Sequence, residues 1–338
     1  MKIVFFETMP GEEEYFRGSA SLPRDCELVF FEDTLRPDTI ASAAGADVVC
    51  VFVKSAVNKE LIDSLAGVKL IITRSTGYDH LDWQYAASKG IRTANVSSYG
   101  AHTVAEFAFG LMLMLSRKLY QAYHQLREGM DFTQRELQGF DLNGKTLGVI
   151  GTGRIGRNAI AIARGFGMDV LAFDSYPDPA FAQAAKFPYV SLEQLLAKSD
   201  IVTIHAPFTP ETHHLLGAEQ FQQMKKGVLL INTARGEIIN TEALIVALKD
   251  GTVAGAGLDV LEGERDLASE FELLANDSTH AVDFRQLAAD HLLIDLPNVI
   301  VTPHVAFNTR EAMQEIMRVV AETIGNWATG KDQKYLQP

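Results

Sequence analysis

Short apolar runs alternate with segments of helical spacing along most of the chain. In the first hundred residues, polar or glycine-containing turns separate the apolar runs, which is typical of buried strands. The strands predicted here span residues 3–6, 28–31, 48–53, 70–73 and 93–96, and residues 58–65 have helical character. Strands that alternate with helices predict a small α/β unit with a parallel sheet.

The same alternation resumes at Lys145 and continues almost to the end of the chain. The strands predicted in this half span residues 146–150, 170–173, 201–205, 228–232, 255–260 and 299–302. Helical segments such as 192–198 and 242–249 separate most of them. This half therefore predicts a second parallel sheet with helical crossovers.

Four stretches depart from this alternation. The helix after Tyr99 is apolar nearly all round, so we expect it to be buried at a domain or subunit boundary. Residues 119–144 are polar and irregular, and they read as a linking arm. Residues 262–297 are acidic, with short helices expected over 267–276 and 284–293, and their role stays open. A last helix begins near residues 308–309 and is expected to return to the first unit.

A glycine-rich turn follows the first strand of the second half. The sequence reads G-T-G-R-I-G from Gly151, between an apolar run and a helical segment. In such a unit Gly151 forms the tight turn, Gly153 lets the backbone approach a pyrophosphate, and Gly156 lets the helix pack on the strand. The N–H groups at the helix start then face two phosphates. The pattern predicts a dinucleotide site.

Asp174 ends the next apolar run and indicates which dinucleotide binds. A carboxylate at this place accepts hydrogen bonds from the adenosine ribose and repels a 2′-phosphate. No Arg or Lys lies between Ser175 and Pro179 to offset that repulsion. NAD is therefore favoured over NADP. Enzymes that bind S-adenosylmethionine share part of this layout, so the glycine turn alone does not define the chemistry.

Three polar residues lie at or just beyond predicted strand ends in the second half, namely Arg235, Glu264 and His304. One such residue is commonly structural, but three beside a nicotinamide favour a joint catalytic role. Hydride transfer to a 2-oxo acid needs a proton donor, which an imidazole supplies near neutral pH. A guanidinium suits the substrate carboxylate and carbonyl, and a carboxylate beside the imidazole favours its protonated form.

The turn after the fourth predicted strand is a second candidate site. It runs from Arg74 to Asp82 and contains Thr76 and Gly77. Ligands of open α/β sheets bind beyond the carboxyl ends of strands, and a glycine-containing turn can offer backbone N–H groups to a carboxylate. A plain strand-to-helix turn capped by an aspartate explains the same residues equally well.

Composition agrees with two domains and argues against several function classes. A chain of 338 residues with 47% apolar content is long enough for two cores. A net charge of −13 without a basic run argues against a nucleic acid or an anionic membrane surface as partner. Cys26 and Cys50 have no metal-ligand spacing, so we expect no metal site and a cytoplasmic location. Residues 1–6 read as a strand and not as a signal peptide.

Four motifs, in this order and spacing, resemble the D-isomer-specific 2-hydroxyacid dehydrogenases, and most closely their D-lactate dehydrogenase branch. They are G-T-G-R-I-G, I-N-T-A-R-G-E, G-L-D-V-L-E-G-E and T-P-H-V-A-F. The resemblance covers nearly the whole chain. It implies an NAD-dependent oxidoreductase that transfers hydride reversibly between NADH and a 2-oxo acid, with pyruvate and D-lactate as the expected pair.

The resemblance also implies roles for individual residues. Those implied for catalysis are Arg235, Glu264 and His304. Those implied for the substrate are the backbone N–H groups of Thr76 and Gly77, together with Tyr99, Arg235 and Phe307. Those implied for the cofactor are Gly151, Gly153, Arg154, Ile155, Gly156, Asp174, His205, Pro207, Thr233, Ala234, Asp259 and His304. Among them, Asp259 would contact the nicotinamide carboxamide.

The family's two domain crossovers would fall near Tyr99 and Phe307. Residues 1–99 and 307–338 would then form a discontinuous, smaller flavodoxin-like α/β substrate domain. Residues 100–306 would form a Rossmann-type doubly wound NAD-binding domain. The resemblance also implies a homodimer built through the NAD-binding domains.

One departure from the family concerns the substrate pocket. The branch often has A-Y-S-P before the long helix, where this chain has S-Y-G-A around Tyr99. The tyrosine is kept, and it favours pyruvate or a slightly larger 2-oxo acid. The alternatives are a dehydrogenase of phenylpyruvate, hydroxypyruvate or glyoxylate, or, from another class, an NAD-sensing protein like the related corepressors.

Overall fold

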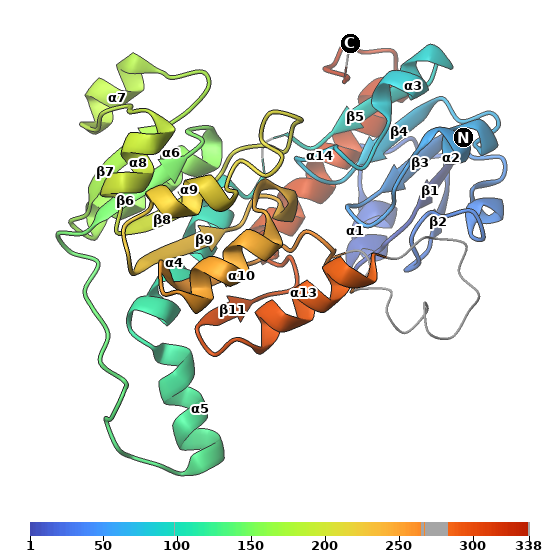
Figure 1. Cartoon of the computed structure of the whole chain (residues 1–338). Coiled ribbons are helices and arrows are strands. Elements are labelled where there is room, and N and C mark those ends of the chain that lie inside the picture. Colours follow the sequence, from blue (N-terminus) through green and yellow to red (C-terminus); the bar gives the residue numbers. More distant parts are fainter. Residues whose placement is uncertain (98, 265–266, 268–282, 337–338) are drawn as a thin grey trace. The chain divides into compact units, whose positions relative to one another are not determined.

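Two parallel sheets organise the chain, and each lies in its own unit (Figure 1). Unit 1 comprises Met1–Gly100 and Asn308–Pro338, and unit 2 comprises Ala101–Phe307. The structure is a computed structural model that describes residues 1–97, 99–264, 267 and 283–336. The predicted α/β class, with two parallel sheets and helical crossovers, is confirmed.

Unit 1 contains a five-stranded parallel sheet of order β2-β1-β3-β4-β5. Its strands are β1 (Lys2–Phe5), β2 (Glu27–Phe30), β3 (Val48–Val51), β4 (Leu70–Thr73) and β5 (Arg92–Asn95). Its helices are α1 (Glu12–Gly18), η1 (Ile40–Ala43), α2 (Lys59–Ser64), α3 (Trp83–Ser88) and α14 (Arg310–Ala328). The strand order reverses between β1 and β3, which is where sheets of this type bind ligands.

The burial of the strands explains their apolar sequences. Every residue of β3 and β4 is buried, as expected where both faces of a parallel sheet are covered. β3 ends at Val51, before the predicted end at residue 53. The hydroxyl of Thr309 caps α14 by accepting a hydrogen bond from Ala312 N, and α14 packs against α1.

Unit 2 contains a six-stranded parallel sheet of order β11-β10-β9-β8-β6-β7. Its strands are β6 (Thr146–Ile150), β7 (Asp169–Phe173), β8 (Ile201–Ile204), β9 (Val228–Asn232), β10 (Val253–Leu258) and β11 (Val299–Val301). Its helices are α4 (Ala101–Ser116), α5 (Leu119–Gly129), α6 (Arg154–Gly165), α7 (Pro179–Ala185), α8 (Leu192–Lys198), α9 (Ala218–Gln223), η2 (Gly236–Ile238), α10 (Thr241–Lys249) and α13 (Phe284–Asp295). The order reverses between β6 and β8, so the glycine turn after β6 lies at the switch point.

Helices cover both faces of this sheet because its strands alternate their side chains. Ile201 of β8 belongs to an apolar cluster with α4 and α6. The next residue, Val202, belongs to a second cluster with α8, α9 and α10. A strand with apolar residues at every position therefore serves two cores, one on each face.

The long helix α4 is buried mainly on one side within its own unit, and burial of its other side at a domain or subunit boundary stays a prediction. Met112 and Ala108 are fully buried, and α4 packs against α6, β9 and β10 of its own unit. Phe107, Leu113 and Met114 are only partly buried. The apolar residues on that side of α4 are therefore not explained by packing within the unit.

A helix occupies much of the stretch that we expected to be irregular. α5 spans Leu119–Gly129 and has no buried residue, and it projects from the rest of unit 2 (Figure 1). Good helix formers such as Gln, Ala, Leu and Arg explain why it is helical. The apolar pattern did not predict α5, because its apolar residues are few and are mixed with polar ones.

The acidic stretch is only partly described. α13 spans Phe284–Asp295, so the helix expected over 284–293 is confirmed and extends to Asp295. The helix expected over 267–276 lies outside the described residues, apart from Leu267. Among the helices that the structure describes, none combines the length and the apolar character needed to cross a membrane.

Candidate active site

The glycine turn after β6 has the close contacts that its sequence predicts. Gly151 has a φ of +90°, and a Cβ there would lie 2.6 Å from Ala206 N. A Cβ at Gly156 would collide with the carbonyl oxygen of Gly151. Glycine is therefore required at the first position for backbone conformation and at the last position for the approach of α6 to the turn.

The start of α6 can accept an anion. A Cβ at Gly153 would meet no atom within 4 Å, so the space in front of the turn is open. No side chain caps α6, and its first turn, which begins at Arg154 and Ile155, contains no acidic residue. Backbone N–H groups and the positive end of the helix dipole both favour a phosphate at such a place.

Asp174 follows β7 and lies against the glycine turn. Its Oδ2 accepts hydrogen bonds from Thr152 N at 2.6 Å and Thr152 Oγ1 at 2.7 Å. Its Oδ1 accepts one from Tyr176 N at 2.8 Å. The Thr152 hydroxyl also lies 2.8 Å from the Tyr189 hydroxyl. The fold thus brings Asp174, the carboxylate predicted to bind the adenosine ribose, to the glycine turn and fixes it there.

Two buried polar groups beyond β8 and β9 fit a bound dinucleotide. His205 Nε2 lies 3.1 Å from Thr203 Oγ1, but no described residue bonds its Nδ1. The buried Thr233 hydroxyl likewise has no partner among the described residues. Buried polar groups are nearly always hydrogen-bonded, so a ligand with polar edges would satisfy both. Pro207, whose carbonyl accepts a bond from Thr212, and Ala234 follow the same two strands.

Burial also determines the charge of His205. The side chain lies inside unit 2, and desolvation lowers its pKa from 6.5 to about 4. The imidazole is therefore neutral at physiological pH. A neutral ring can offer one donor or one acceptor at Nδ1 to a ligand.

His304 lies on a loop that a buried carboxylate organises. Asp259, which follows β10, is 1% exposed. Its Oδ1 accepts hydrogen bonds from Thr302 Oγ1 at 2.6 Å and Val305 N at 3.0 Å, and its Oδ2 accepts one from Ala306 N at 2.8 Å. Burial raises the pKa of Asp259. These bonds surround His304, whose φ of +54° is unusual for a residue other than glycine.

Glu264 and His304 lie in direct contact. His304 Nδ1 is 2.9 Å from Glu264 Oε1, and both side chains are partly exposed. A carboxylate at Nδ1 fixes the ring orientation and leaves Nε2 available to a substrate. The ring of Phe307 meets the His304 ring edge-on, with 6.4 Å between centroids. The fold brings these three predicted site residues together.

Arg235 follows β9, and the next residue, Gly236, packs on the segment that leads to Glu264. A Cβ at Gly236 would collide with the backbone of Leu261 and Glu262. The Asn232 side chain donates to Arg235 O at 2.8 Å and accepts from Ala234 N at 3.0 Å. The backbones that carry Arg235 and Glu264 therefore lie side by side.

The remaining candidates lie in unit 1, in the turn after β4 and the segment after β5. Thr76 Oγ1 donates to Val96 O at 3.0 Å, and Asn95 Nδ2 donates to Thr76 O at 2.7 Å. Ser75 Oγ donates to Gly77 O at 2.6 Å. The side chains thus bind carbonyl groups and fix the turn. Tyr99 is the next candidate along the chain, at the end of unit 1, and it is half-buried.

Known proteins resemble this chain over almost its full length. The sequence model for the NAD-binding domain of the D-isomer specific 2-hydroxyacid dehydrogenases matches residues 109–306. The chain belongs to this family. The D-lactate dehydrogenase of Escherichia coli is 38% identical over 333 residues, which cover 98% of each chain. A 2-hydroxyacid dehydrogenase homolog of Haemophilus influenzae is also 38% identical over 333 residues, which cover 98% of this chain and 97% of that one.

A solved structure agrees with these matches. The D-lactate dehydrogenase of Aquifex aeolicus, solved with NAD and lactic acid, superposes with a TM-score of 0.87 at 32% identity, over 97% of this chain and 96% of that one. The predicted two-domain Rossmann fold, the NAD cofactor and the reaction class of an NAD-dependent D-2-hydroxyacid dehydrogenase are confirmed.

Sequence reasoning missed the residues that support this dehydrogenase's site from behind. Thr152 donates to Asp174 and lies in hydrogen-bond contact with Tyr189, and Thr302 donates to Asp259. Thr152 lies inside the glycine motif and Thr302 inside T-P-H-V-A-F, so both could have been suspected. Tyr189 carries no such signal, because only the fold brings it to the glycine turn.

Replacement of His205 by Gln should make the enzyme less sensitive to acid. Because the pKa of His205 is about 4 in the fold and 6.5 normally, unfolding takes up a proton between these values. Stability is therefore full above pH 6.5 and falls by about 3 kcal/mol as the pH approaches 4. Urea unfolding at pH 7, 5.5 and 4.5 measures this. The exposed His102 provides a control, since His102→Gln should keep the wild-type dependence of the unfolding free energy on pH. The same dependence in His205→Gln as in wild type would contradict the argument.

Proposed function

We propose that this D-2-hydroxyacid dehydrogenase interconverts pyruvate and D-lactate, with NADH and NAD as cofactor. The 2.9 Å contact between His304 Nδ1 and Glu264 Oε1 is the observation that carries the mechanism. Tyr99 and the D-lactate dehydrogenases among the relatives support pyruvate over other 2-oxo acids. When bound, the reduced nicotinamide supplies the hydride.

His304, Arg235 and Glu264 perform the remaining chemistry. His304 gives a proton from Nε2 to the carbonyl oxygen of the 2-oxo acid during reduction, and it takes the proton back during oxidation. Arg235 binds the substrate carboxylate and polarises the carbonyl with its planar guanidinium. Glu264 accepts from His304 Nδ1 and favours the imidazolium form that reduction requires.

Unit 1 is the substrate domain in this proposal, and unit 2 is the NAD-binding domain. Backbone N–H groups of Thr76 and Gly77 bind the substrate carboxylate, and Tyr99 and Phe307 line the pocket. Carboxylate binding by backbone groups fits the turn after β4, because its side chains bind carbonyl groups and leave the N–H groups to a ligand.

The cofactor contacts divide along the dinucleotide. The N–H groups of Arg154 and Ile155 bind the pyrophosphate above the glycine turn, and Asp174 binds the adenosine ribose. His205 and Pro207 lie beside the adenosine, and Thr233 with Ala234 lies near the nicotinamide ribose. Asp259 accepts from the carboxamide in addition to organising the His304 loop, since a carboxylate has about four acceptor positions and three are used.

We also propose a cytoplasmic homodimer that binds neither nucleic acid nor membranes. The exposed apolar residues of α5 and the segment after it support a dimer, because a second copy would bury them. They are Leu119, Tyr120, Tyr123, Leu126, Met130 and Phe132. Light scattering should give twice the monomer mass of 37.1 kDa. The net charge of −13 supports the exclusion of anionic partners.

An assay of NADH oxidation tests the substrate. We expect the highest kcat/KM with pyruvate among pyruvate, phenylpyruvate, hydroxypyruvate, glyoxylate and 2-oxoisocaproate. A higher value with another acid would reassign the substrate within the same reaction. Tight NADH binding without turnover of any of the five would instead support the NAD-sensing protein.

Replacement of Arg235 by Gln should remove about 3 kcal/mol or more of transition-state stabilisation, the usual effect of losing one preorganised electrostatic contact. Steady-state kinetics should therefore show kcat/KM for pyruvate lowered roughly 10²-fold or more. The matched control is Arg285→Gln, because Arg285 lies exposed on the same unit in an ion pair with Glu242. Wild-type kcat/KM in Arg235→Gln would remove this residue from the mechanism.

Replacement of Glu264 by Gln should change the pH dependence of reduction. Reduction needs protonated His304, so kcat/KM falls as the pH rises. Without the carboxylate the imidazolium loses its charged partner, and the fall should move to lower pH. The control Glu242→Gln removes an exposed charge of the same unit and should leave the profile in place. Coincident profiles of Glu264→Gln and wild type would disprove the pairing.

A further inference from the structure

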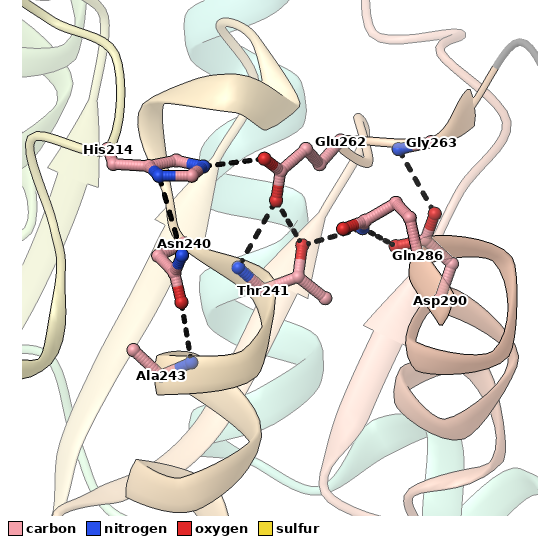
Figure 2. A network of polar contacts seen from close by, with 8 residues as sticks. All are labelled: His214, Asn240, Thr241, Ala243, Glu262, Gly263, Gln286 and Asp290. Atoms are coloured by element: carbon pink, nitrogen blue, oxygen red, sulfur yellow. Dashed lines mark hydrogen bonds and ion pairs between the residues drawn. The ribbon is translucent and has the colours of Figure 1, made fainter. Parts of the chain in front are cut away.

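A network of hydrogen bonds lies behind the segment that carries Glu264 (Figure 2). At one end Glu262 Oε2 accepts from the buried Thr241 hydroxyl at 2.8 Å, and Glu262 Oε1 lies 2.5 Å from His214 Nε2. His214 Nδ1 lies 3.4 Å from Asn240 Nδ2, and Asn240 also caps α10. The Glu262 side chain is therefore tied to the start of α10 and to the loop before α9.

The other end of this network is a fully buried aspartate on α13. Asp290 is 0% exposed. Its Oδ2 accepts from Gly263 N at 3.0 Å, and its Oδ1 accepts from Gln286 Nε2 at 3.0 Å. Gln286 Nε2 also donates to Thr241 Oγ1 at 3.0 Å. Figure 2 shows this continuous path from His214 to Asp290, with Glu262 and Gly263 held between α10 and α13.

Close packing fixes the same segment. On one side, a Cβ at Gly236 would collide with the backbone of Leu261 and Glu262. On the other side, a Cβ at Gly263 would collide with Asp290 and lie 3.0 Å from Gln286 Cγ. The backbone of residues 261–263 thus has little freedom to shift, and Glu264 is the next residue.

Stabilisation of the fold does not explain why this network is present, because it contains two carboxylates. Burial raises the pKa of Asp290 to about 6, and the nearby Glu262 adds to that effect, while His291 opposes it. Two carboxylates in one partly buried network are costly unless neutral donors satisfy them. Here the donors are the Thr241 hydroxyl, the Gln286 amide and Gly263 N–H. Such directed bonds specify a geometry.

The hydrogen bonds also argue against a cation site. His213, His214 and Glu262 could bring three ligand atoms within 4.8 Å of one another. However, both ring nitrogens of His214 already have partners. The exposed His213 ring stacks on the His214 ring with 3.9 Å between centroids.

We propose that Glu262, Thr241 and Asp290 are positioning residues that hold the 261–263 backbone so that the Glu264 carboxylate meets His304 Nδ1. They touch neither substrate nor cofactor in this scheme, which rests on the proposed roles of Glu264 and His304. A shift of this backbone by about 1 Å would break a hydrogen bond of 2.9 Å. The network therefore acts on the reaction through the contact between Glu264 and His304.

Two variants that leave the charge unchanged test this role. Thr241→Val removes the hydroxyl that links Glu262 to Gln286, and Gly263→Ala places a methyl group against Asp290. In both, kcat/KM for reduction should be roughly threefold lower than wild type at the alkaline end, so that the alkaline fall of the profile moves to lower pH. Because the pKa of Asp290 is about 6, the profiles are compared over roughly pH 8–10, where Asp290 stays ionised. The dissociation constant of NADH, from fluorescence, should stay at the wild-type value.

Two controls separate positioning from damage to the fold. Thr241→Ser keeps the hydroxyl and should restore the wild-type profile. Glu242→Gln removes a charge from α10 that contacts Arg285 and not the network, and it should not move the profile. In the double variant Thr241→Val/Glu264→Gln, the shift should equal that of Glu264→Gln alone, because both changes act through one contact.

The outcomes distinguish this inference from the proposed function. If Glu264→Gln moves the profile but Thr241→Val and Gly263→Ala do not, the network has no positioning role and the proposed mechanism stands. If Glu264→Gln leaves the profile unmoved, the proposed role of Glu264 fails, and the positioning role fails with it. Additive shifts in the double variant would also overturn the inference, since the network would then act independently of Glu264.

Discussion

The site depends on the constraint that parallel strands end at the same edge of their sheet. In unit 2 this edge collects the glycine turn after β6, Arg235 after β9 and His304 after β11. These residues are far apart along the chain, and no local structure could bring them together. The strand order reverses between β6 and β8, which leaves space beside the first turn for a ligand. The glycine turn and the side chains proposed for catalysis therefore share one edge.

Polar groups at this edge are fixed by other polar groups behind them. Asp259 gathers three donors from the loop around His304 and thereby holds a histidine at a φ of +54°. Such a conformation costs roughly 1–3 kcal/mol, and the buried carboxylate offsets that cost. Thr152, whose hydroxyl also contacts Tyr189, fixes Asp174 in a similar way. The fold itself therefore orients Asp174 and His304, and such preorganisation is the condition for strong electrostatic catalysis.

In unit 1, charged side chains of the chain itself lie at the carboxyl ends of the parallel strands. Glu7, after β1, accepts bonds from Phe52 N, Lys54 N and Ser55 N beyond β3. Arg74, which is 1% exposed, pairs with Glu12 and donates to the carbonyl of Glu7. The protein's own charged groups thus fill the switch point of this sheet. In the proposed function, the turn after Arg74 offers backbone N–H groups to a small anion, the substrate carboxylate.

The sequence by itself determined the parallel α/β units and the glycine turn, and it indicated Arg235, Glu264 and His304 as catalytic candidates, a role that stays a prediction. Strand periodicity and glycine chemistry are local, so they can be read without coordinates. The prediction of an irregular stretch was wrong at α5, where helix propensity outweighed a weak apolar pattern. Only the tertiary structure decided that Asp259 organises the His304 loop and that Asp290 meets Gly263 N. Those contacts join elements distant in sequence, and each arises from the burial of a carboxylate that must find donors wherever the packed chain supplies them.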